Sequence, residues 1–171
     1  SGAISITGSS TISAVSSYGI FVDGSGAQTK ILSTSGAITL DGTGSASASS
    51  LQIGLRFKTD VQVISTSGNI TLIAQAPTIG DHINANGAII VNSGSGNLSV
   101  YTNGWASTMN AMTLTTTGTL TVAPKTASTT MGIGSGANTL QIADSYLPYL
   151  SAGADVFGST APGNLRVSTG A

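Results

Sequence analysis

The phrase Gly-x-(Ile/Leu)-x-(Ile/Leu/Val) occurs six times along the chain and constrains its fold more than any other feature of the sequence. The intervals between successive phrases range from 22 to 45 residues, so the chain is not a rigid repeat of fixed length. Turn-and-strand phrases at variable spacing are typical of a solenoid whose strands keep their places while its loops vary in length. The phrases begin at Gly2, Gly36, Gly68, Gly96, Gly118 and Gly163.

Short apolar stretches fill the sequence between these phrases. Pairs and triplets of apolar residues recur at intervals of about ten residues, and Gly, Ser, Asn or Thr bounds them. Most alternate with a period of two or are rich in β-branched residues, which is typical of β-strands. No longer window has the period of about 3.6 residues that marks a helix. The chain is therefore predicted to be all-β.

Two all-β architectures fit strands at this spacing, an antiparallel sandwich and a parallel β-helix. Asn-Gly and Asp-Gly pairs favour hairpins and keep the sandwich as an alternative. The β-helix explains more, because stacked coils place Gly at each corner, where a positive φ allows a sharp bend. We expect a right-handed parallel β-helix of roughly six coils, each with about three strands and about 28 residues, spaced about 4.8 Å apart. It is expected to occupy residues 1–171 as one domain.

The position of a residue within each phrase predicts its environment. The residue after the corner Gly is Asn in three phrases, and a partial ladder of hydrogen bonds between coils is expected at Asn69, Asn97 and Asn164. The alternative is that Asn stands there only because it favours turns. The first apolar residue of each phrase is expected to point inward and to form one core column: Ile4, Ile38, Ile70, Leu98, Leu120 and Leu165.

One stretch, "IADSYLPYLSAG" at 142–153, departs from the strand pattern. Asp144 is a candidate N-cap, an apolar cluster follows it, and Gly153 is a candidate stop signal. We therefore expect a short helical insertion near 143–152, laid across a coil.

Composition narrows the functional classes. Only 6% of the residues are charged, against about 25% in an average soluble domain, whereas Ser, Thr and Gly account for 73 of the 171 residues. No apolar run approaches the roughly 20 residues that span a bilayer, so no membrane span is expected. The absence of Cys excludes a disulfide scaffold, a Cys-ligated zinc site and a thiol nucleophile. The five Lys and Arg residues are scattered, so we expect no nucleic-acid partner.

Three stretches, "STSGAITLDGTG", "STSGNITLIA" and "SGSGNLSVYTNG", resemble the repeat region of filamentous-haemagglutinin-like exoproteins. These are large bacterial surface proteins, many of them secreted by the two-partner route. The closing stretch "NTLQIADSYLPYLSAGADVFGSTAPGNLRVSTG" is similar to the order of strand, short helix and strand in those repeats. The resemblance implies a parallel β-helix segment of an adhesin or surface fibre, outside the cell or at its surface. The family's secretion domain, with its Asn-Pro-Asn-Gly-type motif, is absent, which implies an internal piece or a fibre subunit.

The sequence therefore favours a structural or adhesive segment of an exported bacterial surface protein, not an enzyme, with no cofactor. Neither end carries the amphipathic helix or charged strand that caps a solenoid, and bare coil ends invite pairing. We expect the partners to be neighbouring coils of the same long chain or of like subunits, stacked end to end. Host or cell-surface glycans are further candidate partners.

The alternative from another class is a carbohydrate-active β-helix enzyme, a polysaccharide lyase or glycosidase. Glycoside hydrolysis requires two carboxylates a short distance apart. Asp23 and Asp41 stand in the matching phrases "VDGSG" and "LDGTG" and could converge, although both also fit Asx turns. They are also the candidates for weak calcium binding, but no tandem calcium-binding repeat surrounds them. Arg56 and Lys58, near Asp60, are expected on an exposed strand face in salt pairs.

Three ring-bearing residues complete the candidates. Trp105 lies in the polar segment "YTNGWAS" near Tyr101, so the two are candidates for contact with a sugar ligand. The alternative is that Trp105 caps an edge of the core. His82 is alone in "GDHINAN", which predicts a solvated loop histidine and no transition-metal site.

Overall fold

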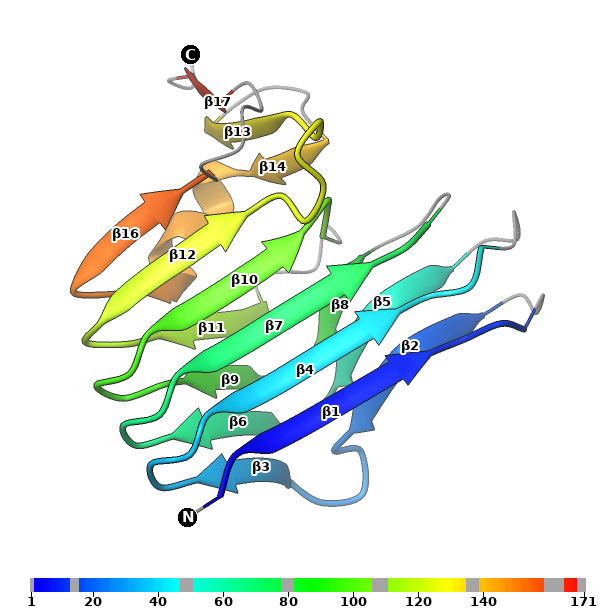
Figure 1. The fold of residues 1–171 in the computed structure, drawn as a ribbon, viewed down its shortest axis with the longest axis vertical. Coiled ribbons are helices and arrows are strands. Elements are labelled where there is room, and N and C mark those ends of the chain that lie inside the picture. Colours follow the sequence, from blue (N-terminus) through cyan, green and yellow to red (C-terminus); the bar gives the residue numbers. More distant parts are fainter. Residues whose placement is uncertain are drawn as a thin grey trace.

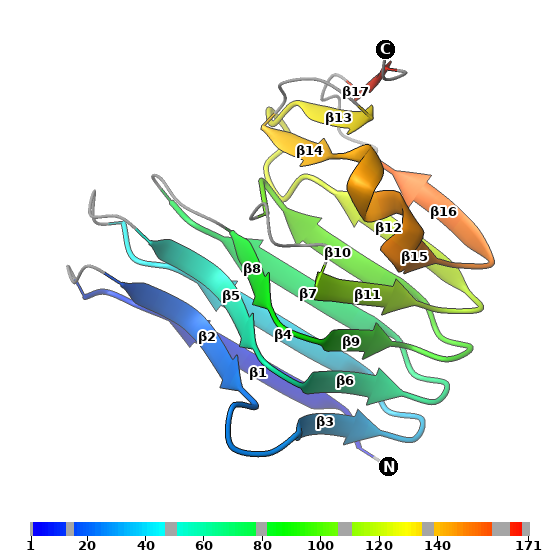
Figure 2. The ribbon, with the colours of Figure 1, turned by 180° about the vertical axis from the view of Figure 1, so that it is seen from behind.

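The chain forms a right-handed solenoid of parallel β-strands, with 57% of its residues in strands and 5% in helix (Figures 1 and 2). Every strand pair among the described residues is parallel, which confirms the predicted β-helix and excludes the antiparallel sandwich. The number of coils was overestimated, since the solenoid has about four turns instead of roughly six. The computed structural model describes residues 2–12, 16–46, 51–77, 82–105, 111–134, 139–158 and 165–168.

The strands form four sheets. The long sheet contains, in order, β1 (Ile4–Ser9), β4 (Ile38–Thr43), β7 (Ile70–Gln75), β10 (Leu98–Thr102), β12 (Thr119–Ala123) and β16 (Ala154–Phe157). The second sheet contains β3 (Thr29–Ser33), β6 (Val61–Ser65), β9 (Ile89–Asn92), β11 (Met112–Thr115) and β15 (Leu150–Ser151). The third sheet contains β2 (Ser17–Asp23), β5 (Gln52–Lys58) and β8 (Ile83–Asn86). The end sheet contains β14 (Leu140–Ile142), β13 (Met131–Gly134) and β17 (Leu165–Ser168).

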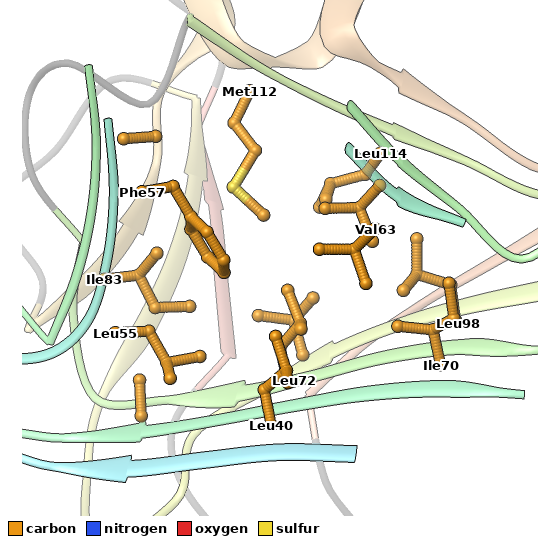
Figure 3. Close-up of a cluster of buried hydrophobic side chains, with 14 of the residues drawn as sticks. Leu40, Leu55, Phe57, Val63, Ile70, Leu72, Ile83, Leu98, Met112 and Leu114 are labelled. Atoms are coloured by element: carbon orange, nitrogen blue, oxygen red, sulfur yellow. The ribbon is translucent and has the colours of Figure 1, made fainter. Parts of the chain in front are cut away.

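Alternation of apolar and polar residues explains the strands of the long sheet and the second sheet. Buried and half-buried residues alternate along β4, β6, β7 and β10, so every second side chain points inward. Parallel pairing then stacks like on like, with Ile38 opposite Ile70 and Ile70 opposite Leu98. Figure 3 shows the resulting core, in which Phe57 and Met112 from other sides of the coil point toward these rows.

The predicted core column contains five of its six expected members. Successive strands of the long sheet place these residues opposite one another, and all but the first are fully buried. The first is half-buried because its strand lies at the edge of the sheet. The five are Ile4, Ile38, Ile70, Leu98 and Leu120.

The prediction for the sixth member, Leu165, was wrong. Leu165 lies in β17 of the end sheet, and Asp155 of β16 takes the place opposite Leu120. The corner that begins β16 is Gly153, whose backbone N–H donates to the carbonyl of Gly118 (3.0 Å). Gly153 is followed by Ala-Asp-Val-Phe, which has Asp where the phrase requires Ile or Leu. The phrase therefore does not match at this corner.

The overestimated number of coils has a different cause. Among the described residues, the long sheet still contains six strands, because β16 fills the sixth place, but the second sheet contains five strands and the third sheet three. In the described part of the chain, the third sheet consists of β2, β5 and β8, and Trp105 supplies the next position as an isolated bridge to Ile83. Between β12 and β15 the chain leaves the coil to form β13, β14 and a helix.

The predicted helical insertion is present as the 3-10 helix η2, Asp144–Tyr149, with Pro148 inside it. The N-cap is Ala143 and makes no side-chain cap bond, so Asp144 is the first helical residue and not the cap. None of the residues of η2 is buried, and the helix lies beside β11 and β15 (Figure 2). No helix within the described ranges combines the length and the apolar character needed to cross a membrane.

Candidate functional site

The corners that lead into the long sheet bring the backbones of successive coils into close contact. A Cβ atom on Gly68 would lie 2.3 Å from the carbonyl oxygen of Gly36, and one on Gly96 would lie 2.4 Å from that of Gly68. None of these three glycines has a positive φ, so the expectation of a left-handed bend was wrong here. Glycine is required at these corners because a side chain has no room.

Buried or half-buried hydroxyls close the same corners, and the sequence analysis did not predict them. Ser65 Oγ accepts a hydrogen bond from the N–H of Gly68 (2.9 Å) and donates to the carbonyl of Gly36 in the preceding coil (3.3 Å). Thr116 Oγ1 likewise donates to the carbonyl of Gly96. The signal in the sequence is a Ser or Thr two or three residues before each corner glycine. We name this set the turn hydroxyl column: Ser33, Ser65, Ser93 and Thr116.

The predicted asparagine ladder is present, in a form that uses the backbone. Asn69 Oδ1 accepts a hydrogen bond from the N–H of Asn97 (2.9 Å), and Asn97 Oδ1 accepts one from the N–H of Thr119 (3.0 Å). Each side chain thus bonds to the main chain of the next coil instead of to its counterpart side chain. Asn164 lies outside the described residues.

Trp105 is fixed by contacts within the chain. Its Nε1–H donates to the carbonyl of Gln141 (2.8 Å), and its ring meets that of Tyr146 edge to face, with centroids 5.8 Å apart at 88°. The side chain is half-buried and packs against the core. These contacts agree with a cap over the open side of the fourth coil, since an amphipathic ring with its N–H satisfied seals an apolar edge.

Tyr101 lies on the outward face of β10, half-buried between Ile73 and Ala123 of the neighbouring strands. The ring partner of Trp105 is Tyr146, and the structure pairs no ring with Tyr101 among the residues it describes. The two residues proposed for sugar contact therefore do not form one platform.

Asp23 and Asp41 do not form a pair. Asp23 ends β2 in the third sheet, whereas Asp41 lies within β4 of the long sheet. Asp23 Oδ1 accepts hydrogen bonds from the backbone N–H of Ser25 (2.8 Å) and from its hydroxyl, which forms the Asx turn. Within the described ranges, no three His or Asp side chains gather as a metal site would require. Asp81 lies outside those ranges.

Asp23 also pairs with Lys58, at 3.3 Å between Oδ2 and Nζ. The hydroxyl and the N–H of Ser25, together with the Lys58 ammonium, hold the pKa of the Asp23 carboxyl below its usual value. The expected salt pairing of Lys58 is thus confirmed, with Asp23 as its partner instead of Asp60. His82, predicted as a solvated loop residue, accepts a hydrogen bond from the N–H of Ala76 at its Nδ1 (2.9 Å).

The outer face of the third sheet carries a cluster that the sequence did not predict. The Tyr18 and Phe21 rings lie 5.2 Å apart, and the Arg56 guanidinium lies over both, 5.2 Å from the centroid of Tyr18 and 5.9 Å from that of Phe21. Phe21 is 46% exposed. We name these three residues the arginine–aromatic patch. The patch forms through the strand register, because Phe21 lies opposite Arg56 across β2 and β5.

The first coil presents an open edge. Among the strands that the structure describes, β1, β2 and β3 pair with β4, β5 and β6 alone, so each has one unpaired side (Figure 1). Ile6 lies opposite the fully buried Leu40 and therefore points inward, yet it is 38% exposed. Its exposure follows from the open end of the coil and not from an outward orientation.

Comparison with protein-family models, with curated proteins and with solved structures gave no match. The likeness of the phrases to filamentous-haemagglutinin-like repeats is thus a resemblance of sequence pattern alone.

Proposed function

We propose that this chain is a rigid structural segment of an exported bacterial surface protein or extracellular fibre, extended by further coils at its open edge. The observation that carries the proposal is the edge formed by β1, β2 and β3. Three strands present unpaired backbone groups there, and inward-facing Ile6 is exposed beside them. Edges of this kind are templates for strand addition, and solenoids usually cover them.

Charge does little to protect this edge. Soluble proteins commonly block open strands with Lys, Pro or inward-pointing charges. β1 consists of Ile-Ser-Ile-Thr-Gly-Ser, without a charge or a proline. Asp23 and Lys30 are the only charged residues of β2 and β3, and Asp23 is already paired with Lys58. The edge thus favours a parallel strand from another coil.

Bonds between coils support a scaffold role. The corner asparagines, the Ser65 and Thr116 hydroxyls and the parallel ladders connect one coil to the next. A stack held this way resists bending as well as twisting, which suits a fibre or an adhesin stalk. The competing interpretation, a carbohydrate-active enzyme, loses the carboxylate pair that the sequence suggested for it, since Asp23 and Asp41 lie in different sheets.

Light scattering of the isolated chain at increasing concentration tests the proposal. The isolated chain exposes the edge whether its natural neighbour is a coil of the same polypeptide or of another copy. We expect the average mass to rise well above 16.8 kDa with concentration. A single 16.8 kDa species at every concentration would contradict the proposal.

Two variants locate the contact. Ile6→Lys places an ammonium on the inward row of the open edge and should hold the chain monomeric, whereas Thr7→Lys adds the same charge on the outward face and should not. Thr7→Pro provides a second, smaller change. The N–H groups of Ile4 and Ser10 bond to the β4 coil, so alternation assigns the N–H of Thr7 to the open side. Its removal should weaken association without loss of the melting transition.

A further inference from the structure

The outer face of the third sheet gathers an unusual mixture of side chains. Register aligns Phe21 with Arg56 in one row across β2 and β5, and Asp23 with Lys58 in the row two residues further along. Asn84 of β8 extends the first row. Neighbouring strands lie about 4.8 Å apart, and rows on one face about 6.6 Å apart along the strand. Aromatic, cationic, carboxylate and amide groups are therefore within reach of one bound molecule.

Arg56 is held in place but keeps its binding capacity. Its guanidinium lies over the Tyr18 and Phe21 rings, and this cation–π contact holds the side chain on the sheet. Among the described residues the ion pair on this sheet joins Asp23 to Lys58, and Arg56 has no carboxylate partner. A guanidinium without a carboxylate partner keeps its N–H donors, in the fork that matches a carboxylate.

Phe21 supplies the second element of the site. Its ring is 46% exposed on a strand whose inward neighbour Ile20 is buried, so the ring contributes little to the core. An exposed ring offers a flat apolar face of the kind that packs against the C–H face of a sugar. Phe21 stays 46% exposed with the Arg56 guanidinium 5.9 Å from its ring centroid, so a ligand that contacts both groups must join an apolar face to an anionic group.

We propose that the arginine–aromatic patch binds a polysaccharide whose sugars carry carboxylates, a uronic-acid polymer. One sugar ring packs on Phe21, its carboxylate binds Arg56, and Lys58 attracts the carboxylate of a neighbouring sugar. The hydroxyls of the polymer donate to Asp23, which stays ionised beside Lys58. In the two rows that include the patch, Arg56 and Lys58 outnumber Asp23, on a chain whose net charge is −1. This inference goes beyond the scaffold role and does not depend on association through the open edge.

Calorimetric titration with a galacturonic acid hexasaccharide tests the proposal. We expect saturable binding that weakens as salt is added, because an ionic contact is screened. Arg56→Gln should weaken binding at least about tenfold, since it removes a charge-assisted, two-point contact. Lys30→Gln is the matched control, because it removes the same charge from an exposed position on β3 of the second sheet, and it should leave affinity unchanged. Equal losses in the two variants would overturn the site.

Two further variants separate stacking from charge. Phe21→Ser should weaken binding several-fold, whereas Leu32→Ser, at a 53% exposed position on β3, should not. Arg56→Lys keeps the charge but loses the planar fork, so its affinity should fall between those of the wild type and Arg56→Gln. Melting curves establish that each variant is folded before it is titrated.

Polymers of different charge test whether the site prefers carboxylates. Neutral dextran should not bind, and dextran sulfate should bind more weakly than the uronate, with less dependence on Phe21. Tighter binding of dextran sulfate, or no binding of the hexasaccharide at millimolar concentration, would refute the proposal. The average mass of the chain is measured at the concentration used for the titration. Association of the chain, which tests the scaffold proposal, is thus measured independently of ligand binding.

Discussion

The part of the solenoid from β1 to β11 and the part from β12 onward use the same kinds of residue to different effect. In the first part, corner glycines touch across coils and the apolar rows from β4 to β11 are fully buried. In the second part, β16 places Asp155 opposite Leu120, Val156 is 46% exposed, and η2 buries none of its residues. The difference teaches that regular stacking, and not composition, determines how much each residue contributes to stability.

The largest effect expected from this contrast concerns the core. Leu72→Ala removes a fully buried side chain from β7 and should lower the free energy of unfolding by about 2–5 kcal/mol. Val156→Ala, on the exposed face of β16, should cost less than about 0.5 kcal/mol. Urea denaturation of the two variants measures both values. Similar losses would mean that the terminal part is packed as tightly as the regular coils, contrary to the structure.

Corner glycines give the second test, and here the two parts should agree. A Cβ on Gly68 would lie 2.3 Å from the Gly36 oxygen, and a Cβ on Gly153 would lie 2.3 Å from the Thr117 oxygen. Each glycine→Ala change should therefore cost about 1–3 kcal/mol through forced backbone shifts. Gly26→Ala is the control, since nothing lies within 4 Å of its added Cβ. A tolerated Gly153→Ala would show that the last corner does not stack as the regular ones do.

The sequence predicted the regular part well for a local reason. Within one coil, the distance from corner glycine to the first inward residue is the same in β1, β4, β7, β10 and β12. Because parallel pairing conserves that offset, Ile38, Ile70 and Leu98 had to align once the strands paired. The constant offset between the corner glycine and the first inward residue therefore predicted contacts between residues far apart in the sequence.

The corner-glycine pattern did not predict which sheet the last strands join. The phrase at Gly163 has the right local pattern, yet Leu165 joins the end sheet, and Asp155 takes the column position without an apolar residue. Which sheet a strand joins depends on the path of the preceding loop. A short sequence motif does not predict that path. The arginine–aromatic patch was missed for the same reason, since Tyr18 and Arg56 belong to different coils and meet only through register.

The asparagine ladder gives a third and smaller test, at the boundary between the two parts. Asn97 Oδ1 accepts the N–H of Thr119, the first residue of β12, so Asn97 connects the regular coils to the strand that follows. Asn97→Ala should cost about 0.5–1.5 kcal/mol, the net value of one hydrogen bond. Hydrogen exchange should speed up at the Thr119 amide more than at the amides of β7. Uniform acceleration would mean that the bond stabilises the whole solenoid and not this junction.

The smallest expected effect is a loss of thermal stability at low pH. It tests a surface contact of the first coils and not their core. The pKa of the Asp23 carboxyl is held below its usual value of 3.8 by Ser25 and then by Lys58. A carboxyl with a depressed pKa in the folded state stabilises the fold above its unfolded pKa, and the contribution is lost as the pH falls through the folded value. The chain should thus melt slightly earlier below about pH 4 than at pH 6.

Asp23→Asn keeps the turn geometry but cannot ionise, so it should lose that part of the acid dependence while melting much like the wild type at low pH. Because Asp23 is exposed and Lys58 is half-exposed, solvent screens the ion pair, and a shift of only a few degrees is expected. Melting curves of both proteins between pH 3 and pH 6 measure it. If the variant kept the full acid dependence of the wild type, the sensitivity would belong to carboxyls elsewhere. The Asp23 turn would then contribute geometry alone.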